Sequence, residues 1–197
     1  MGKVFASLGA HVIEADLIAR QLMQPGQKVY EEVVRRFGQE ILAADGTINR
    51  KALADKAFGT PERPASRAAE LNSIVHPAVG RAQEAWMEDI TQTDHQALAV
   101  VEAALIFEAG LQGQFDRIVV VTCPAATRVR RWMARNYVEE AAARQELERR
   151  MAVQWLEEKK VAAADFLIDN SGSPAEMEMR AREVYGQLKA QASEPAG

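Results

Sequence analysis

The chain has little cysteine, few aromatic side chains and no long hydrophobic run. Its 197 residues include one cysteine, Cys123, and 6% aromatic residues. A single cysteine excludes an internal disulfide, and no cysteine and histidine residues have the spacing of a metal site. The sequence contains no run of about eighteen apolar residues, so we expect no transmembrane helix. The short N-terminal apolar stretch is not typical of a signal peptide. We therefore expect a cytoplasmic protein with no protein-held metal and no membrane partner.

An excess of basic residues is also missing. The formal net charge is -4, which argues against a general nucleic-acid-binding protein, because such proteins usually carry a positive surface. A local basic pocket for a phosphorylated small molecule remains possible under this balance. Hydrophobic residues make up 48% of the chain, which is ordinary for a globular protein of one domain with insertions.

Four short apolar runs predict buried strands. They cover residues 11–14, 97–102, 117–122 and 166–169, and helical patterns separate them. Continuous apolar runs are typical of strands covered on both faces. The sequence therefore predicts an α/β fold with a mainly parallel sheet flanked by helices.

Two long stretches between these runs have a helical pattern. About eighty residues between the first two runs predict a helical insertion, in which Val29, Val33 and Phe37 recur at helical spacing. Pro77 is predicted at the first position of a helix, which places His76 at its start. The arginine-rich stretch from Ala125 to about Ala164 joins the last two runs. Mixed charges on such a helix also fit a solvated face.

Acidic residues follow two of the predicted strands. Asp16 follows the first and Glu108 lies beyond the second, at the carboxyl ends where parallel sheets bind ligands. A role as N-cap of the next helix explains Asp16 equally well, and capping or ion pairing is the alternative for Glu108. Arg131 and Arg135 are four residues apart on one predicted helix face, so they could clamp a phosphate. His76 taken alone is more often structural than catalytic.

Five phrases together carry a family resemblance. They are "LGAHVIEADLIARQLMQPG", "FGQEILAADGTINRKALADKAF", "IVHPAV", "ALIFEAGL" and "ADFLIDNSGS". In their order and spacing they resemble the dephospho-coenzyme A kinases, which are P-loop nucleotide kinases, from about Phe5 to about Ser173. The resemblance implies transfer of the γ-phosphoryl group of ATP to the 3'-hydroxyl of dephospho-CoA, the last step of coenzyme A biosynthesis. It implies ATP and Mg²⁺ at the site, and it leaves the oligomeric state open.

The resemblance also implies a division of the chain and a set of site residues. Residues 1–24, 97–125 and 164–197 would form the nucleotide-kinase core, residues 25–96 the helical substrate domain and residues 126–163 the lid. The implied roles are distributed as follows: Asp16 and Arg135 in catalysis; His76, Phe107 and Glu108 at or beside dephospho-CoA; Arg131, Arg150 and Asn170 at the nucleotide or in the lid.

The family pattern contains a phosphate-binding loop, G-x-x-x-x-G-K-[ST], that these 197 residues do not contain. Gly2 and Lys3 are followed by Val4, where the loop requires serine or threonine. The resemblance therefore predicts that a strand and this loop, roughly fifteen residues, are missing at the front. A start site placed too late and a genuine loss both fit. The chain as given is accordingly expected to bind MgATP poorly.

Three smaller positions also depart from the family pattern. Glu14 stands for the first acid of the family's "DAD", Ala104 for a proline, and Asn136 for an aspartate of the lid, which is also a few residues longer. Two other functions stay open at this point. One is a non-catalytic remnant that binds a CoA-like ligand or a protein partner, and the other is a kinase for another small hydroxyl substrate.

Overall fold

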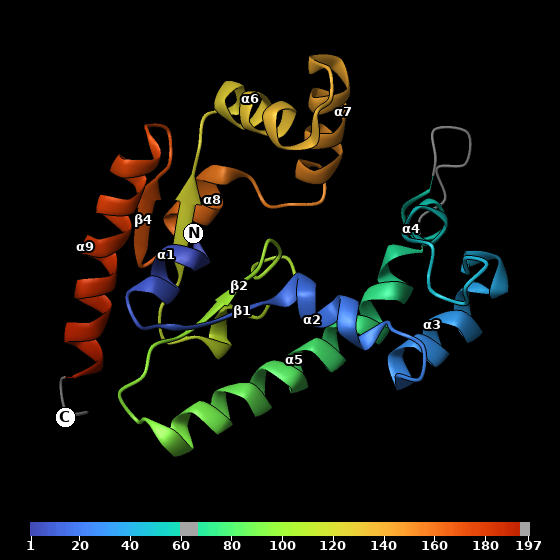
Figure 1. Ribbon diagram of the computed structural model, residues 1–197, viewed down its shortest axis with the longest axis horizontal. Helices are drawn as coiled ribbons and strands as arrows, with labels where there is room; N and C mark the ends of the chain where they lie inside the picture. Colours follow the sequence, from blue (N-terminus) through green and yellow to red (C-terminus); the bar gives the residue numbers. More distant parts are fainter. Residues whose placement is uncertain (60–66, 194–197) are drawn as a thin grey trace. The chain divides into compact units, whose positions relative to one another are not determined.

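The structure is a computed structural model that describes residues 1–59 and 67–193 (Figure 1). The chain divides into two compact units, and the division falls inside the first strand. Unit 1 comprises Met1–His11 and Ala103–Gly197, and unit 2 comprises Val12–Glu102. The predicted three-part division into core, substrate domain and lid stays a prediction.

The described strands lie within the four predicted runs and form two two-stranded sheets. The strands β1 (His11–Glu14) and β2 (Ala99–Glu102) make one sheet, and β3 (Val119–Thr122) and β4 (Phe166–Asp169) make the other. The β3–β4 pair is parallel and in register, from Val119 opposite Phe166 to Thr122 opposite Asp169. Parallel strands joined by helices confirm the predicted α/β class.

Unit 2 is mainly helical and contains α2 (Ala15–Leu22), α3 (Lys28–Phe37), η1 (Gln39–Ile41), α4 (Arg50–Phe58) and α5 (Ala68–Thr93). The predicted apolar positions Val29, Val33 and Phe37 are all buried on one face of α3. They pack with buried residues of the neighbouring helices in one hydrophobic core. Gly38 ends α3 with φ of 89°, a conformation that side chains with a Cβ rarely adopt. Asn49 caps α4 by accepting hydrogen bonds from the N–H groups of Lys51 and Ala52.

The prediction that Pro77 starts a helix was wrong. Pro77 lies inside α5, which runs without interruption for 26 residues, so His76 is a mid-helix residue. A proline removes one backbone hydrogen bond from a helix interior. Burial of Leu71, Val75 and Val79 in the core of unit 2 keeps the chain helical on both sides of that position.

Unit 1 surrounds the β3–β4 pair with helices. They are α1 (Gly2–Ser7), η2 (Gln112–Gln114), α6 (Ala125–Asn136), α7 (Glu140–Met151), α8 (Glu157–Ala162) and α9 (Pro174–Ala192). The helix α9 packs on both β4 and α1. A capping box fixes its start, because the Ser173 hydroxyl accepts from the Glu176 N–H and the Glu176 carboxylate accepts from the Ser173 N–H.

The arginine-rich stretch predicted from Ala125 to Ala164 is helical, but it is divided into α6, α7 and α8. Tyr137 breaks it first, with the left-handed φ of 55°. A segment at 152–156 separates α7 from α8. The breaks let α6 and α7 pack against each other, which brings arginines that are far apart in the sequence to the same ring.

Candidate active site

Asp16 and His76 lie on two helices that pack together in unit 2. Asp16 is in the first turn of α2, directly after β1, and its side chain is exposed. Glu14, not Asp16, occupies the N-cap position, so the capping explanation for Asp16 does not hold. Within the described residues, neither the Asp16 carboxylate nor the His76 ring has a hydrogen-bond or ion-pair partner. Burial lowers the pKa of His76, which favours the neutral imidazole.

Phe107 and Glu108 are held by the segment that joins α7 to α8. The Phe107 ring is buried and stacks on Trp155 with ring centres 5.4 Å apart. One carboxylate oxygen of Glu108, Oε1, accepts from the Trp155 N–H at 2.5 Å and lies 3.1 Å from Lys160 Nζ. Both side chains of the Glu108–Lys160 pair are nearly buried, with 13% and 14% of their surface exposed.

The surroundings of Glu108 favour its charged form. Burial by itself raises the pKa of this carboxyl, but the hydrogen bonds from the Trp155 N–H and Lys160 outweigh it and leave the pKa below its usual value. The second oxygen, Oε2, is buried and has no hydrogen-bond partner in the described part of the chain. Lys160 also donates to Gln154, so this lysine links Glu108 to the segment before α8. Lys160 and Trp155 could not be assigned to this site from the sequence, because each lies far from Glu108 along the chain.

Arg131 and Asn170 meet at the loop that follows β4. Arg131 Nη1 donates to the Asn170 carbonyl at 2.7 Å, and Nη2 donates to the Gly172 carbonyl at 2.8 Å. The Asn170 N–H donates to the Thr122 carbonyl at 2.8 Å, which continues the β3–β4 ladder. The backbone of this loop is therefore fixed on both sides. The Asn170 side-chain amide makes no hydrogen bond within the described residues and can receive a ligand.

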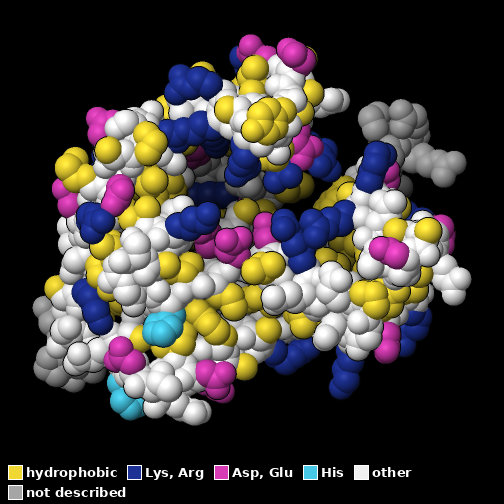
Figure 2. Space-filling view, viewed as in Figure 1, with side chains coloured by type: hydrophobic (Ala, Val, Ile, Leu, Met, Phe, Trp, Pro, Cys, Tyr) yellow, Lys and Arg dark blue, Asp and Glu magenta, His cyan; other side chains and the backbone are white. Residues whose placement is uncertain are grey.

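Arg135 and Arg150 come together over one indole ring. Arg135 is near the end of α6 and Arg150 near the end of α7, and both guanidinium groups lie over Trp132, at 5.1 Å and 4.6 Å from the ring centre. Lys and Arg side chains gather over the α6–α7 region in the space-filling view (Figure 2). A planar cation of this kind binds phosphate oxygens in pairs. Trp132 was missed from the sequence, although its place three residues before Arg135 puts both on one helix face.

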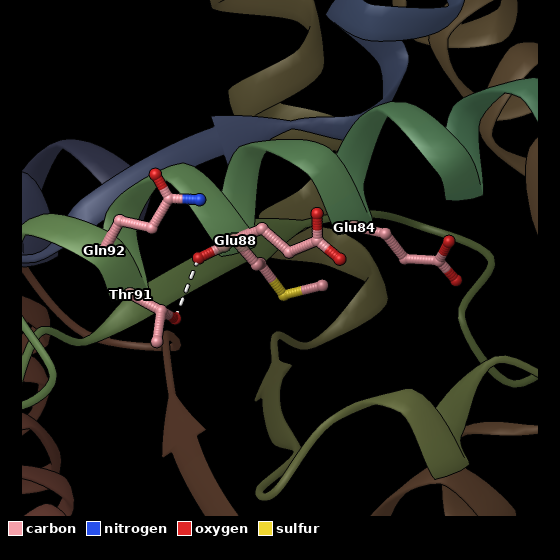
Figure 3. A pocket seen from close by; sticks show the side chains of 5 residues that line it. Glu84, Glu88, Thr91 and Gln92 are labelled. Carbon is pink, nitrogen blue, oxygen red and sulfur yellow. Dashed lines mark hydrogen bonds between the residues drawn. The ribbon is translucent and has the colours of Figure 1, made fainter.

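A shallow groove on α5 does not fit a phosphate. Its lining, drawn in Figure 3, is Glu84, Met87, Glu88, Thr91 and Gln92, all from this one helix. Thr91 Oγ1 donates back to the Met87 carbonyl at 2.9 Å. Two carboxylates and no cation would repel an anionic ligand. None of the predicted site residues lies in this groove.

Residues 1–59 and 67–193 contain no cluster of three or more histidine, cysteine, aspartate or glutamate side chains that could hold a metal ion. The described helices also include none that is long and apolar enough to cross a membrane.

Comparison with known proteins gives one family. Residues 1–176 match the family model described as dephospho-CoA kinase. A dephospho-CoA kinase of Corynebacterium diphtheriae is 39% identical over 191 residues, which are 97% of this chain and 91% of that protein. A Geobacter sulfurreducens protein of the same name is 36% identical and covers 94% of this chain and 89% of its own length.

Two solved structures have the same fold. A Thermus thermophilus protein, known from its crystal structure, superposes on this chain with a TM-score of 0.72 at 31% sequence identity. The superposition covers 99% of this chain and 90% of that protein. A dephospho-CoA kinase from Campylobacter jejuni superposes with a TM-score of 0.62 at 25% identity, covering 96% and 92%.

Proposed function

Because this chain belongs to the dephospho-CoA kinase family, we propose that it transfers the γ-phosphoryl group of ATP to the 3'-hydroxyl of dephospho-CoA. The observation that carries the proposal is the match of nearly the whole chain to relatives with that one activity in their name. Five phrases of the sequence support it independently, since they come from different parts of the chain.

Asp16 is the proposed acceptor of the hydroxyl proton. As the 3'-oxygen forms its bond to the γ-phosphorus, its O–H bond breaks and the proton passes to a carboxylate oxygen of Asp16. The bond between the γ-phosphorus and the bridging oxygen breaks at the same time, and ADP leaves with that electron pair. An exposed carboxylate without a partner among the described residues is free for this role.

Arg135 and Arg150 are proposed to bind the phosphate chain of ATP. Their guanidinium groups would offset the negative charge that spreads over the equatorial oxygens of the transferred group. Asn170 is proposed at the adenine, with Arg131 holding its loop through the two carbonyls described above. Mg²⁺ bound to ATP would offset part of the negative charge of its phosphates.

Phe107, Glu108 and His76 are each proposed to bind dephospho-CoA or to support its binding. The contacts of Phe107 and Glu108 with Trp155 and Lys160 favour support over direct binding for these two residues, because the Phe107 ring and the Oε1 atom of Glu108 are already engaged and the Oε2 atom is buried. His76, with a neutral ring and no partner among the described residues, remains available for direct contact.

A coupled assay of ADP release tests the proposal. With ATP, Mg²⁺ and dephospho-CoA we expect ADP and CoA in equal amounts, at a low rate for these 197 residues, because they do not contain the loop that binds the phosphates. CoA, which already carries the 3'-phosphate, is the control and should give no turnover. Turnover with another small alcohol but not with dephospho-CoA would support the second kinase function. Binding of dephospho-CoA without any ADP release would support a non-catalytic remnant.

A further inference from the structure

We propose that Trp132 is a positioning residue for phosphoryl transfer, because it holds the guanidinium groups of Arg135 and Arg150 in place for the phosphate chain. The inference rests on the proposed function, which assigns those two arginines to ATP. It adds a residue that none of the five family phrases contains. All three side chains belong to unit 1.

The geometry joins two helices at one ring. Trp132 and Arg135 are three residues apart on α6, so their side chains lie on the same helix face. Arg150 reaches the same ring from the last turn of α7, which packs against α6. The guanidinium carbons are 5.1 Å and 4.6 Å from the ring centre, within the range of cation–π attraction.

The two arginines depend on the ring to different degrees. Arg150 Nε also donates to Glu146 Oε1 at 2.7 Å, so a carboxylate fixes it as well. Arg135 is exposed and makes no hydrogen bond or ion pair with any residue in 1–59 or 67–193. The Trp132 ring is thus the main described contact that restricts Arg135.

A ring suits this task better than a carboxylate would. The face of an indole attracts a guanidinium group without neutralising its charge and without occupying its N–H groups, so the donors remain free for phosphate oxygens. Arg131 shows the opposite case, since carbonyls take up donors on both of its terminal nitrogens. A long exposed side chain also loses rotamer freedom when it binds, and a ring that holds it beforehand reduces that loss.

Variants of Trp132 test the proposal in the full chain. Trp132→Leu should lower kcat by about three- to tenfold, since a cation–π contact at an exposed site is modest. The KM for dephospho-CoA should stay unchanged. Trp132→Phe, which keeps an aromatic face, should recover most of the rate. Trp86→Leu on α5 is the matched control and should leave kcat at the parent value.

A spectroscopic measurement separates this inference from the proposed function. In the ligand-free protein, the side-chain proton signals of Arg135 and Arg150 should be displaced upfield by the indole ring current, and Trp132→Leu should abolish the displacement. Absence of that displacement in the parent protein overturns the inference, whether or not the chain turns over.

The double variant distinguishes the remaining cases. In an Arg135→Ala background, Trp132→Leu should lower kcat much less than it does in the parent, because the arginine that depends most on the ring is gone and Glu146 still fixes Arg150. If Arg135→Ala lowers kcat but Trp132→Leu does not, Trp132 has no positioning role although the proposed function stands. If Arg135→Ala has no effect while the ring-current displacement is present, the assignment of Arg135 to ATP is what fails.

Discussion

At the scale of single residues, Asp16 and Glu108 are carboxylates in opposite surroundings. Asp16 is exposed at the start of α2 and has no partner in the described part of the chain. Glu108 is nearly buried, accepts a backbone N–H and pairs with Lys160. A free carboxylate can accept a proton from a substrate, whereas one with fixed partners stabilises the protein that surrounds it.

We expect Asp16→Asn to lower kcat by roughly a hundredfold or more while the melting temperature stays at the parent value. Asparagine has nearly the same shape but cannot accept the hydroxyl proton in the same way. Steady-state kinetics and thermal unfolding of the same preparations measure both effects. Glu14→Gln, at the N-cap of α2, is the control and should change kcat much less. A large fall in melting temperature with unchanged kcat would show that Asp16 is structural.

Glu108→Gln should reduce the free energy of unfolding at pH 7 by about 1–3 kcal/mol, because Lys160 then lacks its charged partner in a nearly buried site. The folded pKa of Glu108 lies below its unfolded value, so its contribution is present above the unfolded value and is lost as the pH falls through the folded one. The difference between variant and parent should therefore shrink below about pH 4.

Urea unfolding at several pH values measures this difference. Glu140→Gln is the matched control, because Glu140 pairs with Arg144 on an exposed helix surface. Its removal should cost less than about 1 kcal/mol. A Glu108 difference that grows on acidification would contradict the assigned direction of the pKa shift.

At the scale of elements, the loop between β4 and α9 is fixed from several sides. Arg131 holds two of its carbonyls, and Arg180 Nη1 donates to the Asp169 carbonyl at 2.7 Å. Ser171 donates to the Asp169 carboxylate through both its N–H and its hydroxyl group. These contacts preorganise the loop, so little conformational entropy of the loop is lost when a ligand binds at Asn170.

Arg131→Lys should raise the KM for ATP several-fold and leave kcat near the parent value. A lysine keeps the charge, but it cannot bond two carbonyls with the geometry of a planar guanidinium group, so the loop that carries Asn170 becomes less ordered. Arg130→Lys is the matched control, because Arg130 is the exposed neighbour on α6 and has no partner in the described residues. Equal KM values for both variants would show that the loop does not depend on Arg131.

At the scale of the whole molecule, the two compact units have separate hydrophobic centres. Ile41 is fully buried in unit 2 and Ile168 is fully buried in unit 1. Truncating either side chain to alanine removes similar volume from a closely packed site, and such changes cost about 2–5 kcal/mol. The two substitutions are therefore a matched pair.

We expect Ile41→Ala to speed amide hydrogen exchange mainly within Val12–Glu102, and Ile168→Ala to speed it mainly within Ala103–Gly197. Local stability follows the packing of each unit, so exchange reports where the lost contacts matter. Exchange followed by mass spectrometry of peptides measures both variants under the same conditions. An equal increase in both units for either variant would mean that the chain opens as one cooperative body.

Local patterns in the sequence determined the positions of most elements. The predicted strands at 11–14 and 166–169 agree with the structure, and so does the helical spacing of Val29, Val33 and Phe37 on α3. Each of these predictions depends on the apolar pattern of residues that are neighbours in the chain. The family was equally visible, because its phrases are continuous stretches that need no folding to be read, and the comparisons confirm it.

Tertiary structure decided how those elements were used. The apolar face of α5 kept the helix intact through Pro77, against the local preference of proline. The packing of α7 on α6 brought Arg150 to Trp132, and the segment before α8 brought Trp155 and Lys160 to Glu108. These pairs are separated by tens of residues, and periodicity carries information over only a few turns. Their contacts follow from which surfaces pack together, and that is settled by the fold as a whole.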